Sequence, residues 1–334
     1  MTIRRDWLDQ IQEEIIEPDY PLVDPHHHFW RTGRFGRYML EELWRDTSSG
    51  HRIERTVFIE CAAEYRTDGP VHLRPVGETE FVAELAAASA QNHTGQARVA
   101  GIVGFADLTL GDAVEEVLNA HIVAGQGLFR GIRHQGTWHA SAEVPNSRIN
   151  PPPDLFEQPA YQAGLRRLGA MGLSFESWNY HTQLPQVMGL AKAAPATTIV
   201  LNHLGGPIGI GPYAGRCAEV FTEWQKSIQE LSQYPNVVVK LGGIAMEVNG
   251  YGWHERALPP TSAELVAAQR PWHLHAIDCF GPDRCMFESN YPVEGISVPY
   301  HVLWNTFKLI AADFSPTEKA ALLGGTATRV YRLA

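Results

Sequence analysis

Eight short runs of apolar, β-prone residues recur along the chain, and most are nearly continuous in Val, Ile, Leu and Phe. Unbroken apolar runs of this length are typical of parallel strands that are covered on both faces. The predicted strands span residues 21–27, 55–63, 97–107, 128–134, 173–178, 198–205, 236–243 and 284–292. The pattern therefore predicts a mainly parallel sheet.

Helical patterns separate several of these runs, at residues 81–91, 112–125, 184–195 and 220–235. The last two stop at Pro195 and Pro235, because proline cannot continue a helix. Strand and helix alternate along all 334 residues without a break in composition. This alternation predicts one α/β domain over residues 1–334, a (β/α)8 TIM barrel, in which residues 1–20 form an N-terminal helical extension.

Long segments without periodicity follow four of the predicted strands, at residues 62–78, 134–160, 205–218 and 243–262. They are rich in Gly, Pro, Trp and His. The loops that follow the strands of a TIM barrel build its active site. We therefore expect long loops, and the chemistry of the protein, at the C-terminal face of the barrel.

Composition narrows the choice of partners. The formal net charge is −10, and an acidic protein repels phosphate backbones, so we expect neither nucleic acid nor a membrane as partner. No run of about 18 apolar residues occurs, the N-terminus lacks the apolar core of a signal peptide, and the four cysteines form no C-x-x-C pair. These features predict a cytoplasmic protein that acts on a small molecule, and a homo-oligomer is compatible with them.

Three consecutive histidines lie in the first predicted strand, in the stretch PLVDPHHHFW. Residues two apart in a strand face the same side, so we expect His26 and His28 to face the barrel mouth, with Asp24 one step deeper on that face. His27 should point toward the helices or a neighbouring strand. His203 ends the sixth strand before a Gly-rich turn and supplies a third imidazole at the same end. These three histidines are candidate catalytic residues.

A divalent metal is one possible role for these imidazoles, since two of them on one face of a strand can chelate a cation. If a metal is bound, its predicted ligands are His26, His28 and His203, and zinc or manganese is the expected ion. The alternative is that no metal is bound and that the histidines act as acid–base and hydrogen-bonding groups.

The last predicted strand carries Glu288 and Asn290, which should share one face and are further catalytic candidates. A buried carboxylate needs a partner. Lys240 could be that partner or could bind substrate. The candidate substrate-binding residues, all near strand ends, are Arg133, His134, Tyr180, His181 and Lys240.

Four motifs together resemble the amidohydrolase-related ("amidohydrolase 2") family over residues 20–333. They are D-x-H-x-H-F-W in the first strand, V-L-N-H-L-G-G-P in the sixth, V-K-L-G-G in the seventh and C-M-F-E-S-N-Y-P in the eighth. The resemblance implies an amidohydrolase-type barrel with His26, His28 and His203 facing inward. The family contains lactonases that act on pyrone dicarboxylate and sugar lactones, some of them without a metal, and it is related to metal-dependent decarboxylases.

The eighth strand departs from the lactonase pattern. In those lactonases it typically reads S-D-W-P, and its Asp takes a proton from the attacking water, whereas this chain has Asn290 at that position. A neutral amide cannot act as a base. Either Glu288 takes over as base or ligand, or one of the three histidines is the base while Asn290 orients water.

Three functions follow from these observations. The first is a hydrolase that opens a lactone or related cyclic ester carrying a carboxylate, with Arg133 or Lys240 binding the anion or polarising the carbonyl. The second is metal-assisted decarboxylation, or other cleavage of a C–C bond, in an aromatic or enol acid. The third is a non-catalytic barrel that binds an acidic metabolite.

Overall fold

The computed structural model describes residues 2–91 and 95–334. Eight strands pair in chain order, and every neighbouring pair is parallel. They are β1 Pro21–His27, β2 Arg52–Ile59, β3 Arg98–Gly104, β4 Phe129–Arg133, β5 Ser174–Ser177, β6 Ile199–Leu201, β7 Val237–Leu241 and β8 Cys285–Phe287. A bridge between His27 and Tyr291 brings the chain after β8 against β1, so the sheet nearly closes. The predicted TIM barrel is confirmed.

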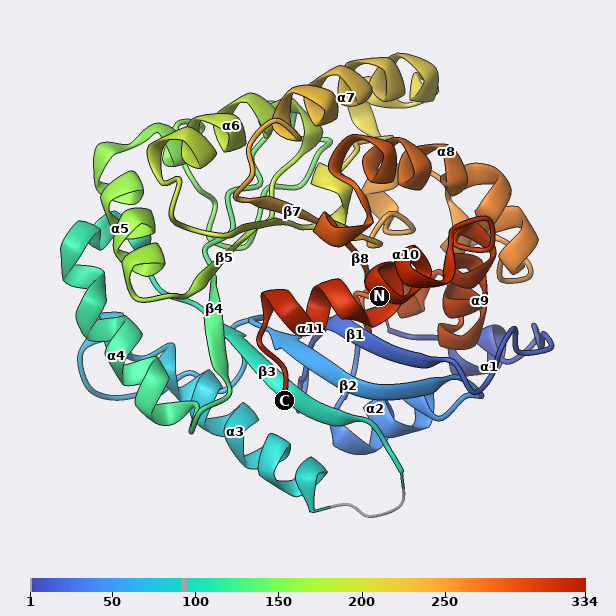
Figure 1. Ribbon diagram of the computed structural model, residues 1–334, viewed down its shortest axis with the longest axis horizontal. Helices are drawn as coiled ribbons and strands as arrows, with labels where there is room; N and C mark the ends of the chain where they lie inside the picture. The colour runs from blue at the N-terminus through green and yellow to red at the C-terminus, as the bar shows by residue number, and fades with distance from the viewer. Residues whose placement is uncertain (1, 92–94) are drawn as a thin grey trace.

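Helices surround this sheet and follow its strands in turn (Figure 1). The principal ones are α2 Leu40–Thr47, α3 Val76–Ala90, α4 Val114–Ala124, α5 Pro159–Ala170, α6 Leu184–Ala193, α7 Cys217–Leu231, α8 Ser262–Phe280 and α9 Tyr300–Ile310. The four helices predicted from periodicity are α3, α4, α6 and α7. Among the described residues, no helix is long and apolar enough to cross a lipid bilayer.

The N-terminal extension is helical over only four residues, α1 Arg5–Leu8. The remainder is irregular and packs on the outside of the barrel, where the backbone nitrogen of Ile16 donates to Asn305 Oδ1 of α9 at 3.0 Å. The described part of the extension expected to be helical over residues 1–20 is therefore mostly irregular and is held by tertiary contacts.

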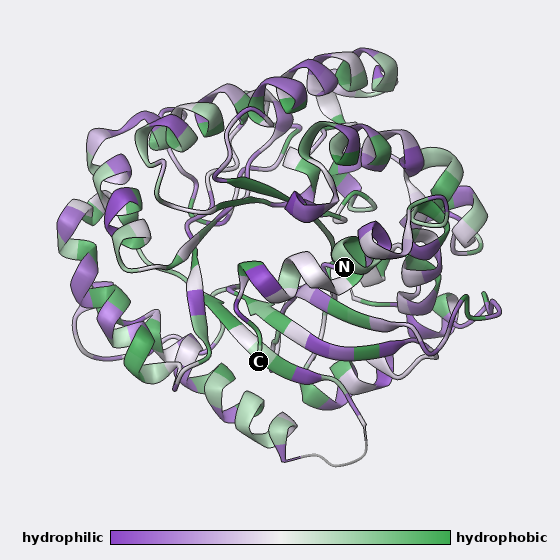
Figure 2. Ribbon diagram, viewed as in Figure 1, coloured by the Kyte–Doolittle hydropathy of each residue, from purple (hydrophilic) through white to green (hydrophobic). Residues whose placement is uncertain are grey.

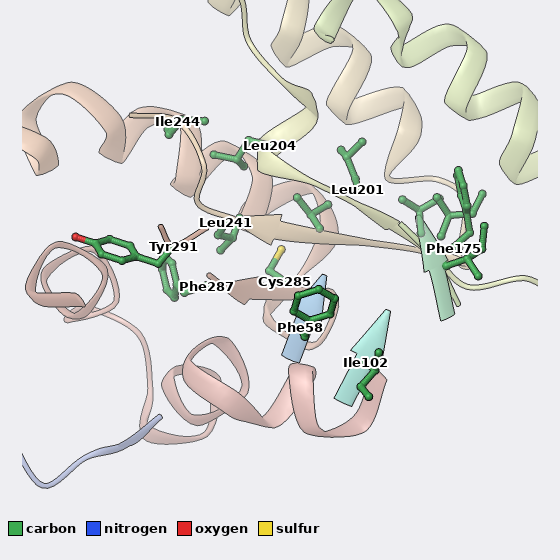
Figure 3. Close-up of a cluster of buried hydrophobic side chains, with 14 of the residues drawn as sticks. Phe58, Ile102, Phe175, Leu201, Leu204, Leu241, Ile244, Cys285, Phe287 and Tyr291 are labelled. Atoms are coloured by element: carbon green, nitrogen blue, oxygen red, sulfur yellow. The ribbon is translucent and has the colours of Figure 1, made fainter. Parts of the chain in front are cut away.

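The apolar side chains form two layers. Outward-facing residues of the strands, among them Phe58, Phe175 and Phe287, pack beneath the helices (Figure 3). In Figure 2 the helices carry hydrophilic and hydrophobic residues side by side, and several of the strands are largely hydrophobic. Inside the barrel a second cluster contains valines of the strands together with Tyr331 and Leu333 from the C-terminal end, just after helix α11 Thr326–Val330. The C-terminal residues thus close one end of the barrel and leave the other for the site.

A β-bulge in β1 decides which residues of PLVDPHHHFW face inward. Asp24 pairs with Thr56 of β2, but His27 pairs with Phe58, so β1 advances three residues while β2 advances two. An extra residue of this kind reverses the alternation of side chains beyond it. Val23 and His26 are three residues apart and would face opposite sides of a regular strand. Because of the bulge, both face the barrel interior.

The bulge overturns one expectation about Asp24. Its carboxylate accepts from the hydroxyl of Tyr300 on α9 at 2.9 Å and from the backbone nitrogen of Ser289 at 3.0 Å. Asp24 thus lies toward the helices rather than on the inward face with His26. His27 contacts Thr56 Oγ1 at 3.0 Å, a strand neighbour, as predicted.

Candidate active site

A cavity of about 400 Å³ lies at the C-terminal end of the barrel. Its walls combine aromatic rings with cationic and hydrogen-bonding side chains. The lining residues are His28, Trp30, Arg34, Phe35, Cys61, Arg133, Gln135, Arg148, Trp178, His203, Met246, Asn290 and Val293. A cavity of this size and mixed polarity suits a small polar molecule with a ring or other flat face.

The floor of this cavity holds a carboxylate between two imidazoles. Glu288 directly follows β8, and its Oε1 lies 2.6 Å from Nδ1 of His203, which lies two residues beyond the end of β6. The other oxygen, Oε2, lies 2.6 Å from Nδ1 of His26, a close contact that lacks the alignment of a hydrogen bond. All three side chains are buried, so the pairing offsets the cost of placing a carboxylate in the barrel interior.

The contact with Glu288 sets the tautomer of His203. A carboxylate only accepts hydrogen bonds, so Nδ1 of His203 carries the hydrogen and donates it to Glu288. The neutral ring then has its lone pair at Nε2, and His203 lines the cavity. No described residue makes a hydrogen bond to Nε2, which leaves that lone pair for a ligand or a water molecule. An imidazole oriented in this way by a carboxylate is the arrangement of a general base.

His26 lies below the cavity, between two permanent donors. Its Nε2 is 3.3 Å from Nη1 of Arg133, and its Nδ1 is 3.2 Å from Nζ of Lys240. Guanidinium and ammonium groups only donate, and a neutral imidazole has a single acceptor nitrogen, so only one of these two contacts can be a hydrogen bond at a time. Burial, followed by the charge of Lys240, holds the pKa of His26 well below its usual range. His26 is therefore neutral near pH 7.

A second carboxylate, Glu176 of β5, neutralises Lys240 at the base of the site. Its Oε2 lies 2.9 Å from Nζ of Lys240, and Tyr331 donates to its Oε1. Asn202 adds a further hydrogen bond from its side-chain nitrogen. This fully buried group separates the apolar plug at the end of the barrel from the imidazoles, and it fixes Lys240 beneath His26.

A third carboxylate, Glu60 after β2, organises the cationic wall of the cavity. Nε of Arg133 donates to its Oε1 at 2.8 Å, Gln135 donates to the same oxygen at 2.7 Å, and Arg148 pairs with Oε2. Burial alone would raise the pKa of Glu60, but Arg148 and Arg133 outweigh it and lower the pKa to about 2. The two arginines together carry one more positive charge than Glu60 balances, so this wall favours an anionic group.

Two further residues present polar atoms to the cavity. His28 donates from Nδ1 to the carbonyl oxygen of Ile59 at 2.7 Å, which leaves the lone pair of its Nε2 unused by any described residue. Asn290 has a buried side-chain nitrogen with no aligned acceptor among the described residues, although the Glu294 carboxyl lies nearby. A buried donor of this kind is available to an oxygen atom of a ligand.

The backbone is unusual at two of these positions. His203 and Asn290, each just beyond a strand, have φ angles of 54° and 52°. Left-handed conformations are uncommon for residues with a Cβ atom, and they are concentrated at functional sites. The conformation turns both side chains from the strand direction toward the cavity that they line.

A sequence profile described as Amidohydrolase matches residues 23–333, nearly the whole chain. The chain belongs to the amidohydrolase family. Its relatives support this assignment: the uncharacterized protein y4mH of Sinorhizobium fredii is 30% identical over 94% of this chain and 99% of its own length. An L-fucono-1,5-lactonase of Burkholderia multivorans is 25% identical over 93% of this chain and 96% of its own length. This amidohydrolase is therefore an enzyme, a hydrolase by family.

Solved structures agree with the fold. A zinc-bound amidohydrolase from Burkholderia multivorans superposes with a TM-score of 0.71 at 24% identity, covering 94% of this chain and 100% of the other. The amidohydrolase barrel and the expected family are thus confirmed together.

The amidohydrolase contains one candidate metal centre within the described part of the chain. His26, His203 and Glu288 each offer a ligand atom, and these atoms all lie within 4.8 Å of one another. Two imidazoles and a carboxylate are a donor set that zinc accepts, and it suits zinc better than manganese, which prefers oxygen ligands. This group contains Glu288 where the sequence suggested His28.

Four of the predicted substrate-binding residues lie away from the cavity. His134 accepts from the backbone of Leu108 at 3.1 Å, and His181 accepts from the backbone of Ile208 at 3.3 Å. Tyr180 donates to the carbonyl oxygen of Pro145 and supports the long loop after β4. Lys240 lies beneath His26. Their predicted contact with substrate therefore gains no support from the cavity, whereas Arg133 lines it.

Sequence reasoning missed Glu60, Glu176 and Arg148. Glu60 is a polar residue at the end of a predicted apolar strand, the same signal that selected His203, and could have been found. Glu176 interrupts an apolar strand and carries the signal of a buried carboxylate. Arg148 lies within a long loop and has no comparable signal, because only the fold brings it to Glu60.

Proposed function

We propose that this amidohydrolase opens a lactone or related cyclic ester that carries a carboxylate. The observation that carries the proposal is the Glu288–His203 pair, which presents an unprotonated imidazole nitrogen to a cavity with a cationic wall. The relative named L-fucono-1,5-lactonase, similar over almost the full chain, supports the same reaction class.

In the proposed reaction, Nε2 of His203 takes a proton from water as the water oxygen attacks the lactone carbonyl carbon. Glu288 stabilises the imidazolium that forms, because it already accepts a hydrogen bond from Nδ1. The same imidazolium then returns its proton to the ring oxygen as the C–O bond breaks. One water is consumed, and the product is an open-chain hydroxy acid. This assigns the base to a histidine and leaves Asn290 free for another role.

Asn290 would stabilise the oxyanion of the tetrahedral intermediate. Asn290 lines the cavity, its buried side-chain nitrogen has no aligned acceptor among the described residues, and a buried donor placed where negative charge develops is an effective form of catalysis. Arg133 and Arg148 would bind the substrate carboxylate, with Glu60 fixing the positions of both guanidinium groups. Aromatic rings of Trp30 and Trp178 would cover the ring of the lactone.

A zinc ion held by His26, His203 and Glu288 would supply a Lewis acid and a water of lowered pKa. The residue roles of Asn290 and of the two arginines do not depend on it. Elemental analysis of protein purified without chelator would measure the metal content directly.

The test is a panel of sugar lactones and carboxylated lactones, with and without His203→Ala. We expect the variant to lose about 10²- to 10⁴-fold in kcat, the range for removal of a general base. Arg148→Gln should raise KM for carboxylated lactones and leave neutral lactones unaffected. Undiminished hydrolysis by His203→Ala would overturn the proposal.

Decarboxylation remains the competing reaction because Asn290 replaces the usual Asp. Turnover in water labelled with oxygen-18 separates the two. Hydrolysis places the label in the product carboxylate. Release of carbon dioxide from the substrate, together with an unlabelled organic product, would favour decarboxylation. An inert protein that still binds acidic metabolites would support the non-catalytic alternative.

A further inference from the structure

A second cavity, of about 500 Å³, lies at the opposite end of the barrel from the active site. We call it the basal groove and define it by Arg55, Arg98 and Arg130 and by the alanines of α3 that face them. Arg55 and Arg98 belong to the first halves of β2 and β3, and Arg130 to the start of β4. Because the strands are parallel, these positions lie at the N-terminal ends of the barrel strands.

The three arginines of the basal groove lack carboxylate partners. Within residues 2–91 and 95–334, no carboxylate oxygen lies within ion-pair distance of any of their guanidinium groups. Neighbouring Arg52 contrasts with them, since it pairs with Glu54 at 2.6 Å and thereby occupies the acidic side chain that borders the groove. Among the described residues, Arg55 donates only to a carbonyl oxygen, that of Leu333 at 3.3 Å. Three arginines that line one cavity without a carboxylate partner are notable in a chain of net charge −10.

Arg130 has a hydrogen-bond donor in the groove that lacks an acceptor. Its Nη1 donates to the carbonyl oxygens of Gly127 at 2.6 Å and Phe129 at 3.1 Å, but its Nε is buried and has no partner among the described residues. Burial, together with the charge of Arg332, lowers the pKa of Arg130. A bound anion would accept a hydrogen bond from Nε and would offset the cost of burying the guanidinium charge.

The opposite wall is apolar. Ala83, Ala86, Ala87 and Ala90 lie along one side of α3, with Val99 and Leu128 below them. Small side chains on a helix leave a shallow apolar surface that a flat ring or a short alkyl chain can cover. Charge on one wall and apolar surface on the other define an amphipathic ligand.

We propose that the basal groove binds a small organic anion, a carboxylate, sulfonate or phosphate group on an aryl or short alkyl body. The anionic group lies among the three guanidinium groups and the apolar body lies against α3. This site is separate from the hydrolytic one and does not depend on the proposed lactonase activity.

The probes are 8-anilinonaphthalene-1-sulfonate, followed by fluorescence, and octanoate as its competitor. We expect saturable binding of one equivalent that weakens as salt is added. Arg98→Gln and Arg130→Gln should each weaken it by about tenfold, the loss of one charge-assisted contact. Ala87→Phe, at an exposed position of α3, should block it by filling the groove.

Arg166→Gln is the matched control, since Arg166 is exposed on α5 and lies outside the groove. It should bind both probes as the parent does, and thermal unfolding should show that all variants are folded. His203→Ala tests whether the fluorescent probe sits in the active site instead. Three outcomes would each overturn the proposal. The first is binding that is lost in His203→Ala but unchanged in Arg98→Gln and Arg130→Gln. The others are octanol binding as tightly as octanoate, and no saturable binding.

Discussion

Asn290 and Glu288 divide between them the work that the usual Asp of this position would do alone. Glu288 supplies a charge but is held below the cavity by two histidines. Asn290 faces the cavity but has no charge to give. In the proposed reaction the proton therefore moves through His203, and the amide of Asn290 stabilises the oxyanion.

Asn290→Ala tests this division. Because the variant removes a donor that acts on the transition state, we expect kcat to fall by about 10²- to 10³-fold with little change in KM. Steady-state kinetics on the best lactone of the panel measure both. Asn290→Asp is the informative companion: if Asn290 is a donor, the carboxylate repels the oxyanion and also lowers kcat. If kcat of Asn290→Asp equals or exceeds that of the parent, this position serves as a base.

Glu294 gives a pH dependence of stability at the same end of the barrel. Burial, with a contribution from the charge of Glu288, raises its pKa to about 8, against the hydrogen bond from Ala245 that lowers it. The folded protein thus keeps a proton that the unfolded chain loses at its ordinary pKa of 4.5. This group makes the free energy of unfolding fall as pH rises through that interval, and the loss is complete above about pH 8.

Glu294→Gln should remove this loss. At about 1.4 kcal/mol per pKa unit, the variant gains up to several kcal/mol relative to the parent between low and high pH. Chemical denaturation at a series of pH values measures the difference. Glu223→Gln, exposed on α7, is the control that should leave the pH dependence unchanged. Parallel stability curves for Glu294→Gln and the parent would contradict the assignment.

At the scale of elements, local pattern was enough to predict the barrel. Each strand is buried on both sides and therefore apolar along its length, so all eight could be located, with ends a few residues too long. The bulge in β1 could not be predicted, because it depends on the register between Asp24 and Thr56 rather than on either sequence alone. It decides that Asp24 lies outside while His26 faces in.

The candidate site followed the same division. His203, Glu288 and Asn290 were predictable because polar residues at the ends of apolar strands stand out. The contacts of the carboxylates Glu60 and Glu176 could not be predicted, because Arg148 and Tyr331, their partners, are far from them in the chain. Lys240 was predicted near a strand end as a substrate-binding candidate or a partner of a carboxylate, but the sequence could not show that this carboxylate would be Glu176, below the cavity.

The C-terminal end of the chain acts as a plug through Tyr331. Its hydroxyl donates to Glu176 from the far end of the barrel, and the residue is fully buried. Tyr331→Phe leaves one oxygen of a buried carboxylate without its donor, which costs about 1.5–3 kcal/mol. We expect that loss in the free energy of unfolding, with little effect on KM because Tyr331 does not line the cavity. Tyr234→Phe removes a hydroxyl that makes no hydrogen bond to any described residue, and it should be near neutral.

At the scale of the whole molecule, the N-terminal segment joins parts of the barrel that are distant in sequence. Trp7 donates to the carbonyl oxygens of Arg256 and Ala257, both at 3.1 Å, in the loop between β7 and α8. Farther along, Asn305 of α9 donates to the carbonyl oxygen of Glu14 at 3.0 Å. The segment thus ties α9 to a loop that borders the active-site end.

Lys308 is the principal anchor of this segment. Its ammonium group, almost fully buried on α9, donates to the carbonyl oxygens of Ile16 at 2.8 Å and Glu17 at 2.7 Å, and it lies 3.0 Å from Nδ1 of His51. Lys308→Met keeps the length of the side chain and removes these donors. The carbonyl groups of Ile16 and Glu17 then lose their donor and must accept hydrogen bonds from water, which loosens the segment from α9.

We expect Lys308→Met to lower the free energy of unfolding by about 3 kcal/mol, the loss of two hydrogen bonds from a charged donor. Limited proteolysis should cut the variant first between α1 and β1, while the barrel stays intact because its own strands pair without the segment. Lys226→Met, exposed on α7, removes a charge without removing an anchor and should match the parent in both measurements. Equal resistance of Lys308→Met and the parent would show that Trp7 and Asn305 suffice to hold the segment, and that the buried ammonium is not its anchor.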